Sequence, residues 1–310
     1  MSTHKRKTVI VTGASSGVGE ALAKRLLKEE RFNVIATARV EKTTETELNL
    51  GGPTPRLAVL DLDLTSHDSR TAFAQNALQC FGCVDVLINN AGISYRSVVE
   101  HMNRKEEWLQ LETNYLGPLA LIRKFLPHMR SRHSGRILNI SSVAGVMAMP
   151  TMSSYSASKF ALEGASEALW YELKPWNISV SCLQLGFVKS DSYLNVYLSE
   201  KAERSLNNPE DPYHLYYRCM GEFVERLMHR SLATPESIAN AIIRVIERES
   251  LPLRVPITLD AHFFFWLRRI FPRRLYHTIL YRNLPSISRW EEAAQKKMQE
   301  VCDLDETKQI

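Results

Sequence analysis

The chain has 310 residues, of which 45% are hydrophobic and 24% are charged, an ordinary globular composition with enough apolar material for a sizeable core. Its formal net charge of +5 is typical of a solvated surface, and we expect no nucleic-acid partner. No apolar run approaches the ~20 residues that span a bilayer, nothing at the start resembles a secretory leader, and the five cysteines are scattered, so we expect a cytoplasmic protein.

The first predicted strand, residues 8–12, leads directly into a glycine-bearing turn and an amphipathic helix, residues 20–29. Glycines let the backbone approach a ligand closely, and a helix N-terminus offers free N–H groups to a phosphate. The order strand, glycine turn, helix is typical of a dinucleotide fold, here spaced Gly-x-x-x-Gly-x-Gly. The alternative is a tight turn that only packs a helix on a sheet.

The second predicted strand, residues 34–38, is followed by Arg39. At this position an acidic side chain binds a ribose 2′-hydroxyl, whereas an arginine forms charge-assisted bonds to a 2′-phosphate. The sequence therefore favours NADP(H) over NAD(H); the alternative is that Arg39 is only a surface residue. The polar segment 41–55 contains Gly and Pro and predicts a loop, after which a third strand, residues 57–62, leads to Asp63, a candidate contact of the adenine.

A helix at residues 69–79 and a fourth strand at residues 85–88 come next. Cys80 and Cys83, between them, lack the second pair of ligands that zinc needs, so we expect no metal site. The fourth strand leads into Asn90, Ala91 and Gly92, small or polar residues at the C-terminal end of a strand, where ligands of open α/β sheets bind.

A long helical region, residues 104–130, contains Asn114 and Pro118. Proline has no N–H, so Pro118 cannot bond the carbonyl of Asn114, four residues earlier. A freed helix carbonyl needs another partner, and ordered water is the usual one. The alternative is that Pro118 only kinks the helix.

The fifth predicted strand, residues 136–140, is followed by Ser142, and the sixth, residues 178–183, by Gly186. The helix between them, residues 154–173, carries Tyr155 and Lys159, which lie about 5–6 Å apart on one face and reach the same volume. A free tyrosine has a pKa of roughly 10, and a nearby lysine cation favours the phenolate, which helps Tyr155 to exchange a proton. The alternation of strands and helices predicts an α/β, Rossmann-type doubly wound parallel sheet of about seven strands with helices on both faces.

The segment 187–232, rich in Tyr, Met and polar residues, predicts a helical flap over the site. Thr234 and Pro235 begin a helix that runs to about residue 249, and a last strand follows at residues 253–259. We therefore expect a catalytic domain, residues 1–260, and a C-terminal extension, residues 261–310.

In these motifs the chain resembles the short-chain dehydrogenase/reductase family, closely from about residue 7 to 190 and more loosely to about residue 259. The motifs are Thr12-Gly-Ala-Ser-Ser-Gly-Val-Gly19, Asn89-Asn-Ala-Gly92, Asn114, Ser142, Tyr155 and Lys159. Residues 155–164 are most similar to the branch of estradiol dehydrogenases and photoreceptor-type retinol dehydrogenases. One departure is Leu185-Gly186 in place of the common Pro-Gly, which removes a source of loop rigidity.

The resemblance implies that Tyr155 exchanges the proton of a carbonyl or alcohol, that Ser142 hydrogen-bonds its oxygen, and that the nicotinamide exchanges hydride. It implies that Lys159 holds the ribose and that Asn114 anchors a water relaying protons to Lys159. We also expect a homodimer or homotetramer. The expected cofactor contacts are Gly13, Ser15, Ser16, Gly17, Val18, Gly19, Arg39, Asp63, Asn90, Ala91, Gly92, Tyr155, Lys159, Gly186, Val188 and Ser190.

Methionines near the catalytic set and aromatic or sulfur-bearing residues in the flap predict an adaptable apolar pocket, made by Met147, Met149, Met152, Tyr193, Tyr197, Met220 and Phe223. We expect a lipophilic alcohol or ketone of the steroid, retinoid or long-chain acyl type; the alternative is that these residues only form core. An NADP(H)-sensing regulator without catalysis is the hypothesis from another class, and the intact Ser-Tyr-Lys set argues against it.

The extension is unusual because residues 261–290 contain six arginines, eight aromatic residues and no acidic residue. Such a segment suits a peripheral association with an anionic membrane, with the rings among acyl chains and the arginines near head groups. The alternative is that the aromatic residues pack back on the flap and the arginines are solvated.

Overall fold

A computed structural model describes residues 6–189 and 196–307. Its centre is a parallel sheet in the order β3-β2-β1-β4-β6-β7-β9. The strands are β1 (Lys7–Val11), β2 (Phe32–Ala38), β3 (Leu57–Asp61), β4 (Val86–Asn89), β6 (Gly135–Ser142), β7 (Ile178–Leu185) and β9 (Arg254–Pro256). The strand order reverses between β1 and β4, so the predicted doubly wound, Rossmann-type fold is confirmed.

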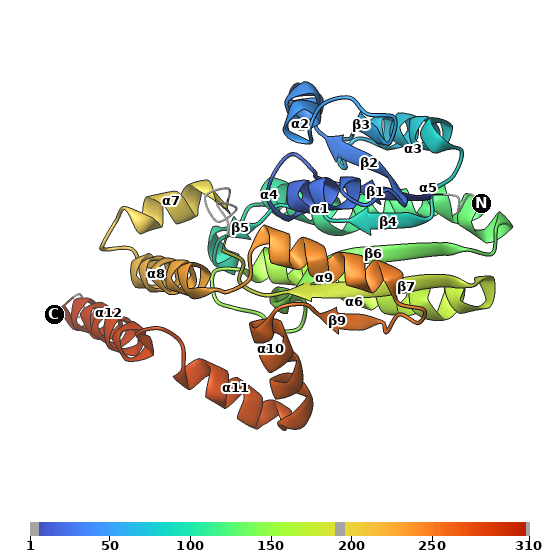
Figure 1. The fold of residues 1–310 in the computed structure, drawn as a ribbon. Coiled ribbons are helices and arrows are strands. Elements are labelled where there is room, and N and C mark those ends of the chain that lie inside the picture. The colour runs from blue at the N-terminus through green and yellow to red at the C-terminus, as the bar shows by residue number, and fades with distance from the viewer. Residues whose placement is uncertain (1–5, 190–195, 308–310) are drawn as a thin grey trace.

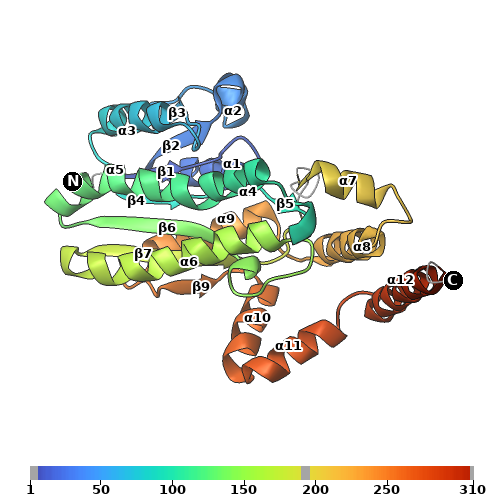
Figure 2. The same ribbon diagram turned by 180° about the vertical axis from the view of Figure 1, so that it is seen from behind.

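Helices cover both faces of this sheet (Figures 1 and 2). One layer contains α1 (Gly17–Leu27) and α9 (Pro235–Glu247), and the other contains α3 (His67–Phe81), α5 (Gly117–Ser131) and α6 (Ser153–Leu173). In β1, Val9 and Val11 pack with α1 and α9, whereas Ile10 packs with α3 and α5. Because both faces of the strand are buried, its β-branched run is continuous rather than alternating.

The prediction of a loop at residues 41–55 is wrong, because the chain there forms a 3₁₀ turn, η1 (Val40–Lys42), and the helix α2 (Thr43–Asn49). Only one residue of α2, Thr46, is buried, so the segment lacks the apolar stripe by which a helix is predicted from sequence. Gly51 and Gly52, with φ of 102° and 79°, end it in a conformation that favours glycine.

Two other predicted boundaries change. The helical region 104–130 is divided into α4 (Arg104–Leu111), a π-helical turn, η3 (Glu112–Leu116), and α5. The last strand is shorter than predicted, because Thr258 caps a new helix, α10 (Leu259–Ile270), by accepting a hydrogen bond from the Ala261 N–H.

Beyond the carboxyl ends of the strands lie the helices of the predicted flap, α7 (Glu200–Leu206) and α8 (His214–Arg230), near a small parallel sheet of β5 (Tyr95–Arg96) and β8 (Tyr197–Leu198) (Figure 1). Three shorter turns complete the main body: η2 (Val99–His101), η4 (Val143–Gly145) and η5 (Lys174–Trp176). After α10, α11 (Arg273–Arg282) and α12 (Ile287–Thr307) run back towards α8.

The extension packs on the flap through part of its aromatic set. Trp290 is buried and stacks on Tyr216 of α8, with ring centroids 4.2 Å apart. Phe263 and Trp266 of α10 instead remain 60% and 52% exposed. The two alternatives for this segment are therefore not exclusive. Among the described residues, no helix is both long enough and apolar enough to cross a membrane.

Candidate active site

The glycine turn is fixed by hydrogen bonds between the ends of β1 and β4. The Thr12 hydroxyl accepts from the N–H groups of Asn90 and Ala91 at 2.9 and 3.0 Å, and the Asn90 amide donates to the carbonyls of Thr12 and Gly13 at 2.9 and 3.1 Å. Two glycines of the turn leave no room for a side chain: a Cβ on Gly13 would lie 2.8 Å from the Ala91 Cα, and a Cβ on Gly19 would lie 2.1 Å from the Gly13 oxygen. The first turn of α1 is therefore held directly against the end of the sheet.

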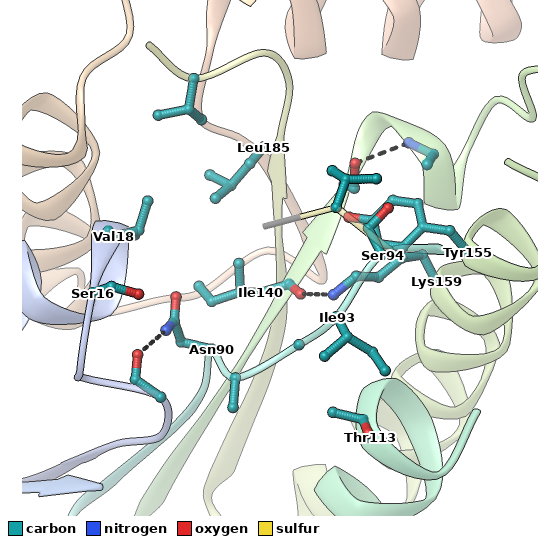
Figure 3. A pocket seen from close by; sticks show the side chains of 18 of the residues that line it. Ser16, Val18, Asn90, Ile93, Ser94, Thr113, Ile140, Tyr155, Lys159 and Leu185 are labelled. Atoms are coloured by element: carbon teal, nitrogen blue, oxygen red, sulfur yellow. Dashed lines mark hydrogen bonds between the residues drawn. The ribbon is translucent and has the colours of Figure 1, made fainter. Parts of the chain in front are cut away.

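A cavity of about 950 Å³ opens at this edge, and residues of the glycine turn, α6 and α8 line it. Figure 3 shows part of its wall, from Ser16 and Val18 to Tyr155 and Lys159. Most of the predicted cofactor contacts line it: Gly13, Ser15, Ser16, Gly17, Val18, Arg39, Asp63, Asn90, Ala91, Gly92, Tyr155, Lys159, Gly186 and Val188. Gly19 does not line it, because it packs on Gly13. Ser190 lies outside the described residues.

Arg39 and Asp63 lie at one end of the cavity, where β2 and β3 finish. The Arg39 side chain is 64% exposed and forms an ion pair with Glu41, with 3.2 Å between Nε and Oε1. An exposed pair of this kind contributes only about 0–1 kcal/mol, so an anionic ligand can replace Glu41 at little cost. One Asp63 oxygen accepts bonds from the Thr65 N–H and hydroxyl at 2.8 and 2.7 Å, which orients the carboxylate at the rim.

At the other end, β6 and α6 bring Ser142, Tyr155 and Lys159 to one wall of the cavity. The Lys159 ammonium donates to the Ile140 carbonyl at 2.9 Å and lies 5.9 Å from the centre of the Tyr155 ring (Figure 3). The Ser142 hydroxyl accepts from the Ala144 N–H at 3.1 Å, which fixes it at the start of η4.

Burial moves the pKa values of the pair in opposite directions, because it disfavours the charged form of each group. Burial raises the pKa of Tyr155, while the Ser142 hydroxyl and the charge of Arg96 lower it. Burial lowers the pKa of Lys159 to about 8. At neutral pH, Tyr155 is therefore a phenol and Lys159 a cation, a pair suited to donating a proton.

Asn114 lies behind this wall rather than in it. Its side chain forms two bonds with the backbone of Ile93, accepting from N–H and donating to C=O, both at 2.9 Å, and it donates to the Ser158 hydroxyl at 3.1 Å. It lies within the π-helical turn before Pro118, a local widening of the helix that is frequent at functional sites. The side chain thus holds the loop after β4 against α6, and a role in proton relay stays a prediction.

Sequence reasoning missed the groups that fix the loop after β7. The Gly186 N–H donates to the Thr258 hydroxyl at 2.9 Å, and the Phe187 N–H donates to the Asp260 carboxylate at 2.7 Å. These bonds restrain the loop directly after Leu185, the last residue of β7, which stands where the family that the sequence resembles commonly has a proline. They were missed because Thr258 was assigned to the predicted strand 253–259, although Thr258 followed by Asp260 is a pattern typical of a helix start.

The third region of the cavity wall is largely apolar. Met147, Met149, Met152 and Tyr197 line it, as predicted. Tyr193 lies outside the described residues. The prediction that Met220 and Phe223 line the cavity is wrong. The helix α8 contributes Val224 and Met228 instead, because it faces the cavity nearer its C-terminus.

The family model for short chain dehydrogenases matches residues 7–200. The 3-ketodihydrosphingosine reductase of Bacteroides thetaiotaomicron is 33% identical over 80% of this chain and 87% of its own length. A short-chain dehydrogenase from Streptomyces avermitilis is 32% identical and covers 94% of this chain and 99% of its own, with a TM-score of 0.73. A metagenomic short-chain oxidoreductase in complex with NADP is 26% identical over 83% of this chain and all of its own, with a TM-score of 0.61.

Replacing Asp260 by alanine leaves the Phe187 N–H without its acceptor. Because a partly buried donor that loses its partner costs about 1–3 kcal/mol, we expect faster hydrogen exchange at Phe187 and a lower free energy of unfolding. Hydrogen exchange read by NMR and denaturant unfolding measure the two effects. The matched control is Asp260→Asn, which keeps an acceptor oxygen and should retain most of the protection of the Phe187 N–H against exchange. If Phe187 exchanges at the wild-type rate in Asp260→Ala, Asp260 is not the acceptor that protects it.

Proposed function

The chain belongs to the short chain dehydrogenase family, and we propose that it uses NADP(H) to interconvert a lipophilic alcohol and ketone. The observation that carries the proposal is that Ser142, Tyr155 and Lys159 line the same cavity as the glycine turn and Arg39. A dinucleotide cofactor and a substrate can therefore meet in one space.

The residues at the sheet edge fit such a cofactor. Gly17 has a φ of 60°, and the space where a Cβ would be is open. The Ser16 side chain makes no capping hydrogen bond to the first turn of α1. The backbone N–H groups of this turn are therefore available to a pyrophosphate. Ala38 leaves no carboxylate at the end of β2, and Arg39 supplies a cation for a 2′-phosphate. When bound, the nicotinamide supplies or accepts the hydride.

The chain's own residues then handle the oxygen of the substrate. Ser142 positions the oxygen through its hydroxyl, and Tyr155 donates the phenolic proton to it during ketone reduction. Lys159 stabilises the resulting phenolate with its charge, which it carries below a pKa of about 8. Alcohol oxidation needs Tyr155 as a phenolate, so raising the pH favours that direction.

The substrate class follows from the apolar wall. Methionine side chains are flexible and adapt to long or irregular apolar ligands. The wall made by Met147, Met149, Met152 and α8 therefore supports a lipophilic substrate, and one relative is named for the reduction of 3-ketodihydrosphingosine.

NADPH oxidation with a ladder of methyl ketones of increasing chain length tests this function. We expect kcat/KM to increase with length, since each buried CH₂ contributes about 0.8 kcal/mol, and Tyr155→Phe to lower kcat by about 10²–10⁴. A wild-type protein that binds NADPH but reduces no carbonyl would support the sensing regulator instead. A small sugar as the best substrate would reject the lipophilic class.

The cofactor preference should depend on Arg39. We expect Arg39→Ala to weaken NADPH binding about 10- to 100-fold, because a charge-assisted bond to the phosphate contributes about 1.5–3 kcal/mol, and to change NADH binding little. Fluorescence titration with each reduced cofactor gives the two affinities. Glu41→Gln removes the competing carboxylate and should not weaken NADPH binding. If Arg39→Ala keeps the wild-type ratio of NADPH affinity to NADH affinity, Arg39 is only a surface residue.

We also propose that the extension docks on an anionic membrane. Phe263, Trp266 and Ile270 follow the i, i+3, i+7 spacing of one helix face and are 60%, 52% and 67% exposed. Arg269, Arg273 and Arg274 are exposed beside them, and each can gain about 1 kcal/mol near anionic head groups. This face would bring the cavity close to a store of lipophilic substrate.

Co-sedimentation with phosphatidylserine vesicles checks the docking. We expect binding that falls with salt and decreases at least about tenfold in the double variant Phe263→Ser, Trp266→Ser, because two aromatic rings leave the interface. Replacing Tyr171, an aromatic residue 62% exposed on α6, by serine is the matched control and should leave binding unchanged. If the protein binds neutral vesicles equally well, or binds neither kind of vesicle, docking on an anionic membrane is rejected.

A further inference from the structure

Arg96 is a charged residue in the cavity wall to which the proposed function assigns no contact with the substrate. It ends the two-residue strand β5 and lines the same cavity as Ser142 and Tyr155. Its side chain is half-buried, and its Nε atom is out of contact with solvent and has no hydrogen-bond partner among the described residues. A buried guanidinium N–H without an acceptor is costly, so its retention needs an explanation.

Other part-buried arginines of this protein have protein partners. Arg70 pairs with Glu112 through Nη1, although its own Nε has no partner. Arg254 pairs with Glu163 and Glu167, and Arg56 donates to three backbone carbonyls. Arg96 has no ion pair with any residue in the described ranges 6–189 and 196–307. An unpartnered Nε therefore occurs also in Arg70, and what distinguishes Arg96 is that its guanidinium as a whole has neither an ion pair nor a side-chain hydrogen bond within these ranges.

No carboxylate near Arg96 offsets its charge within the described part of the cavity. Of the described lining residues, only Asp63 is acidic, and it follows β3, which is four strand positions from β6 and hence about 19 Å away. Burial lowers the pKa of Arg96, and the phenolate form of Tyr155 is the neighbouring charge that raises it. The guanidinium thus lies near the reacting end of the cavity.

The backbone on both sides of Arg96 is fixed. Tyr95 donates its N–H to the Gln110 side chain at 2.7 Å and packs its ring against Tyr197, with centroids 5.2 Å apart. Arg96 pairs with Leu198 across β5 and β8, and Ser97 pairs with Met152. The partners in these contacts come from three other parts of the chain, so the tertiary fold fixes the position of the guanidinium at the wall.

We propose that Arg96 binds an anionic group of the substrate, a carboxylate or a phosphate, close to the alcohol or ketone that reacts at Tyr155. The guanidinium presents parallel N–H donors that match either anion, and the bound anion supplies the missing acceptor. Together with the methionine wall, this makes the substrate an amphiphile with its charge near the reacting carbon and an apolar chain beyond. The inference rests on the proposed function and specifies its substrate class.

Matched pairs of probes test the proposal in the full-length protein with NADPH. The carboxylate arm compares dodecanoic acids carrying an oxo group at the second or fourth carbon with their methyl esters. The phosphate arm compares the phosphate ester of hydroxymethyl decyl ketone with the free alcohol. In at least one arm we expect the wild type to prefer the anion, and Arg96→Gln to lower kcat/KM for that anion about 10- to 100-fold and for its neutral partner less than about threefold. Arg96→Lys, which keeps the charge but not the planar fork, should recover part of the loss.

A role of Arg96 confined to Tyr155 gives a different result. If the guanidinium only favours the phenolate, Arg96→Gln lowers turnover of anion and neutral partner equally and moves the pH profile to higher pH. That outcome overturns the proposal.

A binding measurement distinguishes failure of the proposed function from failure of the anion site at Arg96. If no ketone is reduced, titration calorimetry with dodecanoate and dodecyl phosphate still tests the site. Binding that is lost in Arg96→Gln and partly kept in Arg96→Lys supports an anion site, whereas equal binding to all three proteins rejects it. If neutral ketones are reduced normally and no anion is preferred, the proposed function stands and the anion site does not.

Discussion

The buried ammonium of Lys159 is the constraint on which the arrangement of the site depends. It is only 6% exposed, and it is held by the Ile140 carbonyl of β6. Four residues further along α6, Glu163 is also buried and accepts from Gln184 and Arg254, at 3.0 and 2.8 Å. Since a buried charge without partners is strongly unfavourable, these bonds oppose any shift of α6 along the sheet. The orientation of Tyr155 is therefore set by polar contacts on the helix face that packs on the strands.

Much of the fold was predictable because its determinants are local. The β-branched strands, the glycine turn and the start of α9 at Thr234 each follow from residues adjacent in the sequence. The residues lining the site at the strand ends were predictable for the same reason. Arg96, Thr258 and Asp260 were not, since each acts on groups far away in the chain, and α2 was missed because it buries a single residue. Tertiary contacts of this kind leave no periodic pattern.

The cavity combines two kinds of wall that respond differently to sequence change. At the glycine turn the wall is backbone, and Gly13 and Gly19 leave no room for a Cβ, so substitutions there disturb the fold itself. At the opposite end the wall is made of side chains from the small sheet, the η4 turn and α8. Substitutions there alter shape and charge without moving the strands. Cations line both ends, which gives the whole space a positive potential suited to anionic ligands.

The helix α10 touches two sides of the cavity at once. Asp260, in its first turn, holds the Phe187 N–H after β7, and Arg268, in its last turn, donates to the Val146 carbonyl after η4 and lies 5.1 Å from the ring centre of Phe160. A helix is rigid over this length, so a rotation of α10 displaces both edges together. The loop after β7 and the turn after η4, which both lie next to lining residues of the cavity, therefore move together with α10, including when a load acts on its exposed face.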